Sequence, residues 1–139
     1  MTEANTILLV EDDERTRYTY REWLFEAGYE VIEASTKAVA LMHLDRMELA
    51  AIVLDLVLPN GHGKEVVEAL IAKRNDVGVV VVSGFPDSPE FDFPVVSSLR
   101  KPFPRGVLLS HLQKAQATSD NFRSARDSWR RLRECINED

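Results

Sequence analysis

One acidic residue, Asp55, stands at the end of an apolar run that begins at Ala50. Such a run is typical of a buried strand, and the segment Pro59-Asn60-Gly61 shortly after it predicts a turn. A carboxylate at the mouth of a buried strand loses part of its hydration. We therefore expect Asp55 to be paired, hydrogen-bonded or bound to a cation.

Polar side chains follow three other predicted strands in the same way. These strands are expected at residues 6–10, 77–82 and 95–99, and the side chains beyond them are Glu11 with Asp12, Ser83 and Lys101. In an open parallel sheet, ligands bind outside the carboxyl ends of the strands, at the point where the strand order switches. We therefore expect these polar groups to converge with Asp55 on one edge of a sheet.

Glu11, Asp12 and Asp55 would bring three carboxylates to one place. At an effective dielectric constant of about 20, two unit charges about 4 Å apart repel by about 4 kcal/mol. A divalent cation removes this repulsion, and oxygen ligands without His or Cys favour Mg²⁺ (or Mn²⁺), which is often shared with a substrate phosphate. Lys101 and Ser83 would offer a positive charge and a hydroxyl to an anion beside the metal. A carboxylate in such a site can accept a phosphoryl group and form an aspartyl phosphate.

The elements that must hold these groups alternate between strand and helix. Strands are predicted at about 6–10, 29–33, 50–55, 77–82 and 95–99, and helices at about 14–27, 36–46, 63–74 and 104–118. Gly28 is expected to end the first helix, Ser35 or Thr36 to cap the second, and Pro104 to begin the last. The alternation predicts an α/β domain in which helices cover both faces of a five-stranded parallel sheet.

Four motifs at these strand ends carry a resemblance to a known family: Glu11-Asp12, Asp55 with Leu58-Pro59 and Gly63, Ser83, and Lys101-Pro102-Phe103. Each motif alone is weak, but their order at successive strand ends is specific. Residues 5 to about 117 resemble the receiver domain of two-component response regulators, and in particular the chemotaxis regulators. The resemblance implies a flavodoxin-like, doubly wound fold with the strand order 2-1-3-4-5.

The resemblance also implies a function. Asp55 is expected to accept a phosphoryl group from a phosphohistidine on a sensor histidine kinase or a phosphotransfer protein. The domain would then signal to a downstream protein, which the sequence does not identify. The chain would catalyse its own phosphorylation and dephosphorylation, rather than act as a conventional metabolic enzyme.

The resemblance assigns roles to individual residues of the site. Asp12, Asp55 and the backbone carbonyl of Val57 are expected to bind Mg²⁺ directly, and Glu11 through water. By the same resemblance, Ser83 would hydrogen-bond the phosphoryl oxygens. Lys101 would pair with these oxygens, and its bond to the following Pro102 is expected to be cis.

The sequence departs from the family between residues 84 and 98. Three prolines and no helical stripe in residues 84–94 argue against a full fourth helix, so a short or absent helix is expected. Ser98 also stands where the family has an aromatic switch residue. These changes keep open an alternative function, a degenerate receiver that binds partners without taking phosphate. A phosphatase of the haloacid dehalogenase type would need an acid where Val57 stands.

The residues after the expected receiver domain (1–118) are predicted to form a C-terminal amphipathic helical extension (119–139). Five apolar residues recur there at spacings of 3, 4, 3 and 4, which makes one seam on a helix: Phe122, Ala125, Trp129, Leu132 and Ile136. The seam either folds back on the body or forms a homodimer or partner contact. The sequence leaves these alternatives open.

Length and composition limit the class of protein. A chain of 139 residues is long enough for one domain with its own core. The single cysteine, the absence of a signal-peptide pattern and the lack of a long apolar run predict a cytoplasmic protein without a membrane segment. Residues 118–139 hold five basic and five acidic side chains, so the net charge of −6 lies in residues 1–117. This charge argues against a nucleic-acid surface on the body.

Overall fold

A five-stranded parallel sheet forms the centre of the molecule. The computed structural model describes residues 5–45, 48–55, 57–58, 61–74, 76–84 and 96–136. The strands of the sheet, in spatial order, are β2 (Glu30–Ala34), β1 (Thr6–Val10), β3 (Ala51–Asp55), β6 (Val79–Ser83) and β7 (Val96–Arg100). In chain order this is 2-1-3-4-5, so the predicted flavodoxin-like topology is confirmed.

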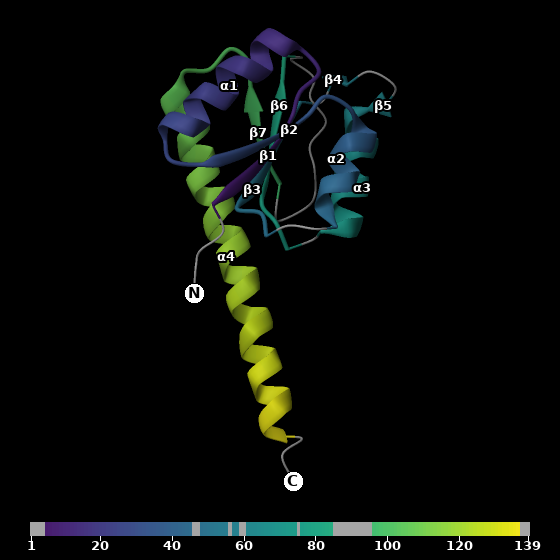
Figure 1. Cartoon of the computed structure of the whole chain (residues 1–139), viewed down its shortest axis with the longest axis vertical. Coiled ribbons are helices and arrows are strands. Elements are labelled where there is room, and N and C mark those ends of the chain that lie inside the picture. The colour runs from purple at the N-terminus through teal and green to yellow at the C-terminus, as the bar shows by residue number, and fades with distance from the viewer. Residues whose placement is uncertain are drawn as a thin grey trace.

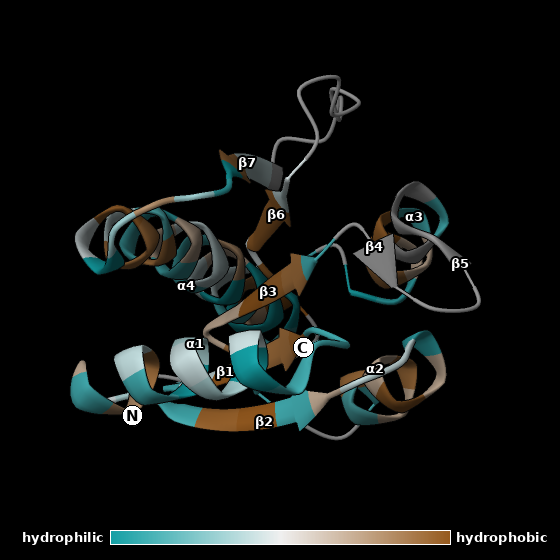
Figure 2. Cartoon of the chain, turned by 90° about the horizontal axis from the view of Figure 1, so that it is seen from above, coloured by the Kyte–Doolittle hydropathy of each residue, from teal (hydrophilic) through white to brown (hydrophobic). Residues whose placement is uncertain are grey.

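Helices cover both faces of the sheet, as predicted. The helices are α1 (Glu14–Glu26), α2 (Lys37–Leu44), α3 (Gly63–Lys73) and α4 (Arg105–Ile136). Helices α1 and α4 lie on one face, and α2 and α3 lie on the other (Figures 1 and 2). Alternate residues of the three central strands enter the two cores, so in β1 Leu8 faces α2 and α3 whereas Leu9 faces α1 and α4. Strands buried on both sides must be apolar throughout, which explains the runs seen in the sequence.

Local signals in the sequence set the helix ends. Asp13 caps α1 by accepting a hydrogen bond from the backbone N of Thr16 at 2.8 Å, and Gly28 follows the helix with a φ of 96°. Thr36, one of the two expected residues, caps α2. Helix α4 begins at Arg105, one residue later than predicted, and the carbonyl of the preceding Pro104 accepts a hydrogen bond from the N of Val107.

The last helix of the body and the predicted C-terminal extension form one continuous helix of 32 residues, α4. The helix runs past the amino ends of the central strands, where Ser119 is 1% exposed. The Ser119 hydroxyl accepts a hydrogen bond from Gly78 N at 2.8 Å and can donate one to Ala50 O at 2.8 Å. A Cβ on Gly78 would collide with the backbone of Ala115, so glycine permits this close approach.

Ion pairs also hold α4 against the segments that precede β3 and β6. Arg123 Nη1 lies 3.2 Å from Glu48 Oε2, and Arg126 Nη1 lies 3.5 Å from Asp76 Oδ2. Burial acts to raise the pKa of Asp76, but the hydrogen bond and charge of Arg74 and the charge of Arg126 hold this pKa below its usual value. The part of α4 after these pairs projects beyond the sheet (Figure 1).

Two features lie outside the predicted elements. Between β3 and α3, β4 (Val57–Leu58) pairs antiparallel with β5 (Gly61–His62), which the sequence reasoning did not predict. The segment 84–94, where a short or absent helix was expected, falls outside the described residues except for Gly84. Among the helices that the structure describes, none is long and apolar enough to cross a membrane.

Candidate active site

Four of the predicted site residues lie at the carboxyl edge of the sheet. Asp55 and Ser83 are the last residues of β3 and β6, and Glu11 and Lys101 directly follow β1 and β7. The strand ladders bring these ends to nearly the same level, because β1 pairs with β3, β3 with β6, and β6 with β7 in parallel register. The structure therefore brings together side chains that are up to 90 positions apart in the chain.

Lys101 forms ion pairs with both buried acids of the site. Lys101 Nζ lies 2.5 Å from Asp55 Oδ2 and 3.9 Å from Glu11 Oε1. Asp55 is 4% exposed and Glu11 2%, so both carboxyl groups have lost most of their contact with water. Burial acts to lower the pKa of Lys101, but the hydrogen bond to Asp55 and the charges of Asp55 and Glu11 raise this pKa above its ordinary value. The ammonium group therefore stays charged and compensates the buried acids.

Glu11 is the most perturbed group of the site. Burial, the hydrogen-bonded contact with the Asp55 side chain and the charge of Asp55 raise the pKa of Glu11 to about 9, against the opposing effect of Lys101. Its Oε2 atom is buried and has no hydrogen-bond partner among the residues that the structure describes. A buried acceptor without a partner is costly, so this site favours either a proton or a cation on Glu11.

The site residues fit a hard cation. Glu11, Asp12 and Asp55 offer only oxygen atoms, and the unpartnered oxygen of Glu11 could accept a water bound to the ion. Asp12 is exposed, and within the described part of the chain no three His, Cys, Asp or Glu side chains gather closely enough to hold a metal. The two buried carboxyl groups of Glu11 and Asp55 suit Mg²⁺, which keeps several waters and needs only one or two carboxylates. The backbone of Val57 lies two residues beyond Asp55, in β4.

The segment that carries Lys101 is fixed from two sides. Its backbone N donates to Ser83 O at 2.7 Å, and the predicted cis bond between Lys101 and Pro102 is confirmed. Phe103 stacks on Tyr20 of α1 with a centroid distance of 5.5 Å, and Trp23 lies against both rings. This cluster holds the lysine over the acids.

The sequence reasoning missed two residues of α1 that support the site. Tyr20 is 7% exposed, whereas Tyr18, two positions earlier in the same helix, is 56% exposed. Arg17 donates from Nη1 to the backbone carbonyl of Glu11 at 2.9 Å, and its Nε lies 3.2 Å from Glu33 Oε1. Arginine on a helix gives no signal of such a contact, because the bond runs to a backbone atom of another element.

Known proteins resemble this chain in sequence. Residues 7–113 match the profile of the response regulator receiver domain. Response regulator RR06 of Streptococcus pneumoniae is 30% identical over 128 residues, which cover 89% of this chain and 57% of that protein. The chain thus spans little more than half the length of this relative.

Solved structures agree with this match. The response regulator StyR is 25% identical with a TM-score of 0.83, over 96% of this chain and 69% of that one. The receiver domain of the sensor histidine kinase PA1611 from Pseudomonas aeruginosa, solved with a magnesium ion coordinated in its active site cleft, has a TM-score of 0.74. It is 23% identical, over 82% of this chain and 98% of that one, and so speaks for the fold alone. The chain belongs to the family of response regulator receiver domains.

Proposed function

We propose that the chain is the phosphoacceptor of a two-component phosphorelay and that Asp55 takes the phosphoryl group. The observation that carries this proposal is the pair of buried acids, Asp55 and Glu11, beside the partly exposed Lys101, with 2.5 Å between Asp55 Oδ2 and Lys101 Nζ. A buried carboxylate paired with a lysine at the edge of a parallel sheet is placed where a ligand can approach.

Phosphoryl transfer requires little of the protein beyond positioning and neutralisation of charge. An oxygen of Asp55 forms the new bond to phosphorus while the bond from phosphorus to the histidine nitrogen of the donor breaks. The electron pair of that bond stays on the nitrogen of the leaving imidazole. Lys101 remains beside the new acyl phosphate and balances its charge, and Ser83 offers a hydroxyl from the neighbouring strand.

We propose Mg²⁺ (or Mn²⁺) as the cofactor, with Asp12, Asp55 and the carbonyl of Val57 as ligands and Glu11 acting through water. When bound, the ion would neutralise the negative charge that the acids share with the phosphoryl oxygens. Support comes from the buried Glu11 oxygen, which has no partner among the described residues. The phosphodonor would be a sensor histidine kinase or phosphotransfer protein, and the output an interaction with a downstream protein. The division into a receiver (1–118) and an extension (119–139) and the cytoplasmic location stay predictions.

The test is intact mass spectrometry after incubation with Mg²⁺ and acetyl phosphate. We expect a gain of one phosphoryl group that is lost at alkaline pH, depends on Mg²⁺ and disappears in Asp55→Asn. Asp45→Asn is a matched control, because Asp45 is an exposed aspartate whose side chain pairs with Lys73 on the surface. This variant should gain the phosphoryl group like the unaltered chain.

A beryllofluoride titration, followed by the fluorescence of Trp23 beside Phe103, completes the test. Binding of this phosphoryl mimic in the unaltered chain but not in Asp55→Asn would support the proposal. A chain that neither gains mass nor responds to the titration would be the degenerate receiver, which binds partners without phosphate. A phosphoryl group that persists in Asp55→Asn would also refute the assignment of Asp55.

A further inference from the structure

The projecting part of α4 exposes large apolar side chains. We call Phe122, Ala125, Trp129, Leu132 and Ile136 the seam, and its four large members are exposed by 42% (Phe122), 65% (Trp129), 49% (Leu132) and 68% (Ile136). Apolar side chains exposed in one continuous row on a helix mark a contact surface. The spacing of 3, 4, 3 and 4 assigns Phe122, Trp129 and Ile136 to the a positions of a heptad and the other two to d.

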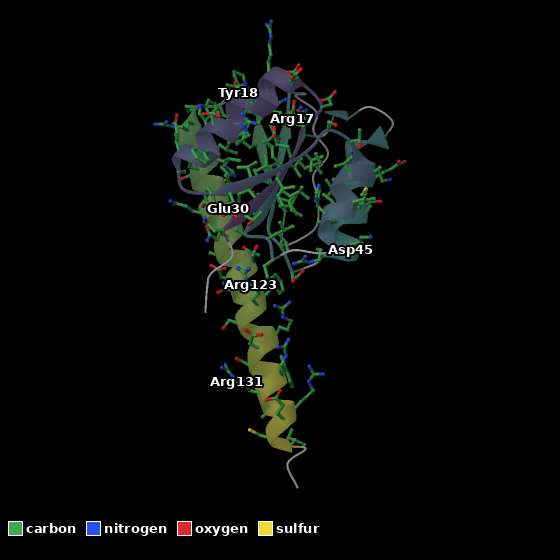
Figure 3. The ribbon with its side chains drawn as sticks, viewed as in Figure 1. Arg17, Tyr18, Glu30, Asp45, Arg123 and Arg131 are labelled. Atoms are coloured by element: carbon green, nitrogen blue, oxygen red, sulfur yellow. The ribbon has the colours of Figure 1, made fainter. Side chains whose placement is uncertain are left out.

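The described part of the body does not cover the seam. The side of α4 that faces the body carries Leu108, Leu112, Ala115 and Ser119, and it continues with Arg123 and Arg126, which pair with Glu48 and Asp76. At 3.6 residues per turn, this side lies roughly a quarter of a turn away from the seam. Figure 3 shows Arg123 where α4 passes the edge of the body and Arg131 on the part beyond it. The fold-back alternative is therefore not how the described residues pack.

A shallow depression in the seam has the composition of a coiled-coil hole. Four residues line it: Ala125, Ser128, Trp129 and Leu132. In heptad terms these are positions d, g, a and d, which together form the hole that receives an a-position side chain from a facing parallel helix. The small Ala125 and Ser128 leave room beside the bulky Trp129. The side chain that would enter this hole in a second copy, in register, is its own Trp129.

We propose that the seam joins two copies of this chain as a parallel, in-register helix pair. The residues that flank the seam decide the orientation. On the e side stand Arg133 and Arg126, the second of which also pairs with Asp76 of its own body, whereas the g side carries the uncharged Ser128 and Cys135. Parallel helices place e against g of the partner, so each arginine meets a neutral side chain. Antiparallel helices place e against e, which would set arginine against arginine at a cost in free energy.

The charge and length of the extension set the strength of the pair. Residues 118–139 hold five basic and five acidic side chains, so two extensions do not repel each other as units. Two and a half heptads bury less than the roughly 1,200–2,000 Å² of a stable standard interface. We therefore expect a weak, concentration-dependent dimer. This inference goes beyond the phosphoacceptor function and does not depend on it, because Asp55 takes no part in the contact.

Disulfide trapping in the full chain tests the orientation. Two variants carry Cys135→Ser and one new cysteine each, Ala125→Cys on the seam or Ser124→Cys beside it. Both positions are exposed on the same turn of α4, so their thiols are equally accessible to oxidant. In a parallel pair the two d positions face each other within reach of a disulfide, whereas Ser124 points outward. With oxidised glutathione, the seam variant should form covalent dimer at least about tenfold faster, as expected for facing thiols.

Sedimentation equilibrium tests the contact without a crosslink. The average mass should rise from 15.8 kDa for the monomer toward twice that value with increasing concentration. The useful protein concentrations run from about 10 µM to about 1 mM, because a pair with a Kd of about 100 µM dissociates within this range. Trp129→Glu should keep the chain monomeric, whereas Arg131→Glu, on the same turn but off the seam, should still associate.

Each alternative gives a different result, and each would overturn the proposal. A monomer over the whole range would mean that another protein or a further segment covers the seam. A mass increase with equal trapping rates would mean an antiparallel pair or a contact elsewhere. A mass increase that survives Trp129→Glu would place the contact outside the seam.

Discussion

The pairing of Lys101 with two buried acids predicts that removing its positive charge destabilises the fold, and that removing one of the acids then restores stability. Lys101→Met keeps most of the apolar stem but removes the charge 2.5 Å from Asp55 Oδ2 and 3.9 Å from Glu11 Oε1. The two carboxyl groups would then stand together without the cation that pairs with both of them. Asp55→Asn removes one of these acids, so it should rescue the Lys101→Met chain rather than weaken it further.

The expected loss of unfolding free energy in Lys101→Met follows from the burial of the ion pair. Removing one partner of a buried ion pair costs about 3–5 kcal/mol, because the other charge is left without compensation. The Lys101 side chain is 29% exposed while that of Asp55 is 5% exposed, so we take the lower end, about 3 kcal/mol of unfolding free energy. Asp55→Asn alone should change stability by less than about 1 kcal/mol, because Lys101 still faces Glu11. In the Lys101→Met background it should restore about 1–2 kcal/mol.

Urea unfolding at neutral pH without Mg²⁺ measures all four chains of this double-mutant cycle. Lys114→Met is the matched control, because Lys114 lies exposed on α4, and we expect a change within about 0.5 kcal/mol. If Lys101→Met costs no more than this control, the ion pair contributes nothing. If the effects of Lys101→Met and Asp55→Asn simply add, the two side chains do not interact, and the reasoning is refuted.

Three further predictions concern the frame that holds the site, all measured by urea unfolding. Gly78→Ala should cost about 2–3 kcal/mol through its collision with the backbone of Ala115, while Gly106→Ala, with open space around its new Cβ, should cost nothing. Equal effects of the two would disprove close packing at Gly78. Ser119→Ala should cost about 1–3 kcal/mol, because it leaves a buried backbone N–H without its acceptor; a smaller loss would mean that water replaces the hydroxyl. Asp76→Asn should cost about 1 kcal/mol at pH 7. Because the folded state lowers the pKa of Asp76, this contribution is present above the unfolded pKa and disappears as the pH falls through the folded value. The same loss at about pH 2.5 as at pH 7 would contradict this assignment.

The sheet and its order were predictable because the strands are buried on both faces. Runs such as the one that ends at Asp55 admit few other structures, and parallel order then follows from the alternation with helices. The hairpin of β4 and β5 was not predictable, since two-residue strands leave no periodic signal. The continuity of α4 was also missed. Ser119 was taken as the start of an extension, yet its hydroxyl is buried against the sheet and carries the helix across that position.

The site residues at the ends of strands were predictable from the sequence. The residues of α1 that pack against the site were not. Glu11, Asp55, Ser83 and Lys101 each follow an apolar run, so the topology alone brings them to one edge. The support from α1 depends on which side of that helix faces the sheet. The exposed Tyr18 and the buried Tyr20 are only two positions apart, and periodicity in one short helix does not separate them.

Because α4 is one continuous helix, a tilt at its amino end would also move its far end. The hydroxyl of Ser119 anchors the helix to the amino edge of the sheet. The helix begins at Arg105, just beyond the Lys101–Phe103 segment. From Ser119 to Ile136 the helix is about 25 Å long, at about 1.5 Å per residue. A tilt of about 10° would therefore swing the tip by about 4 Å. A tilt of the start of α4 would move the far end in the opposite direction, against the ion pairs of Arg123 and Arg126.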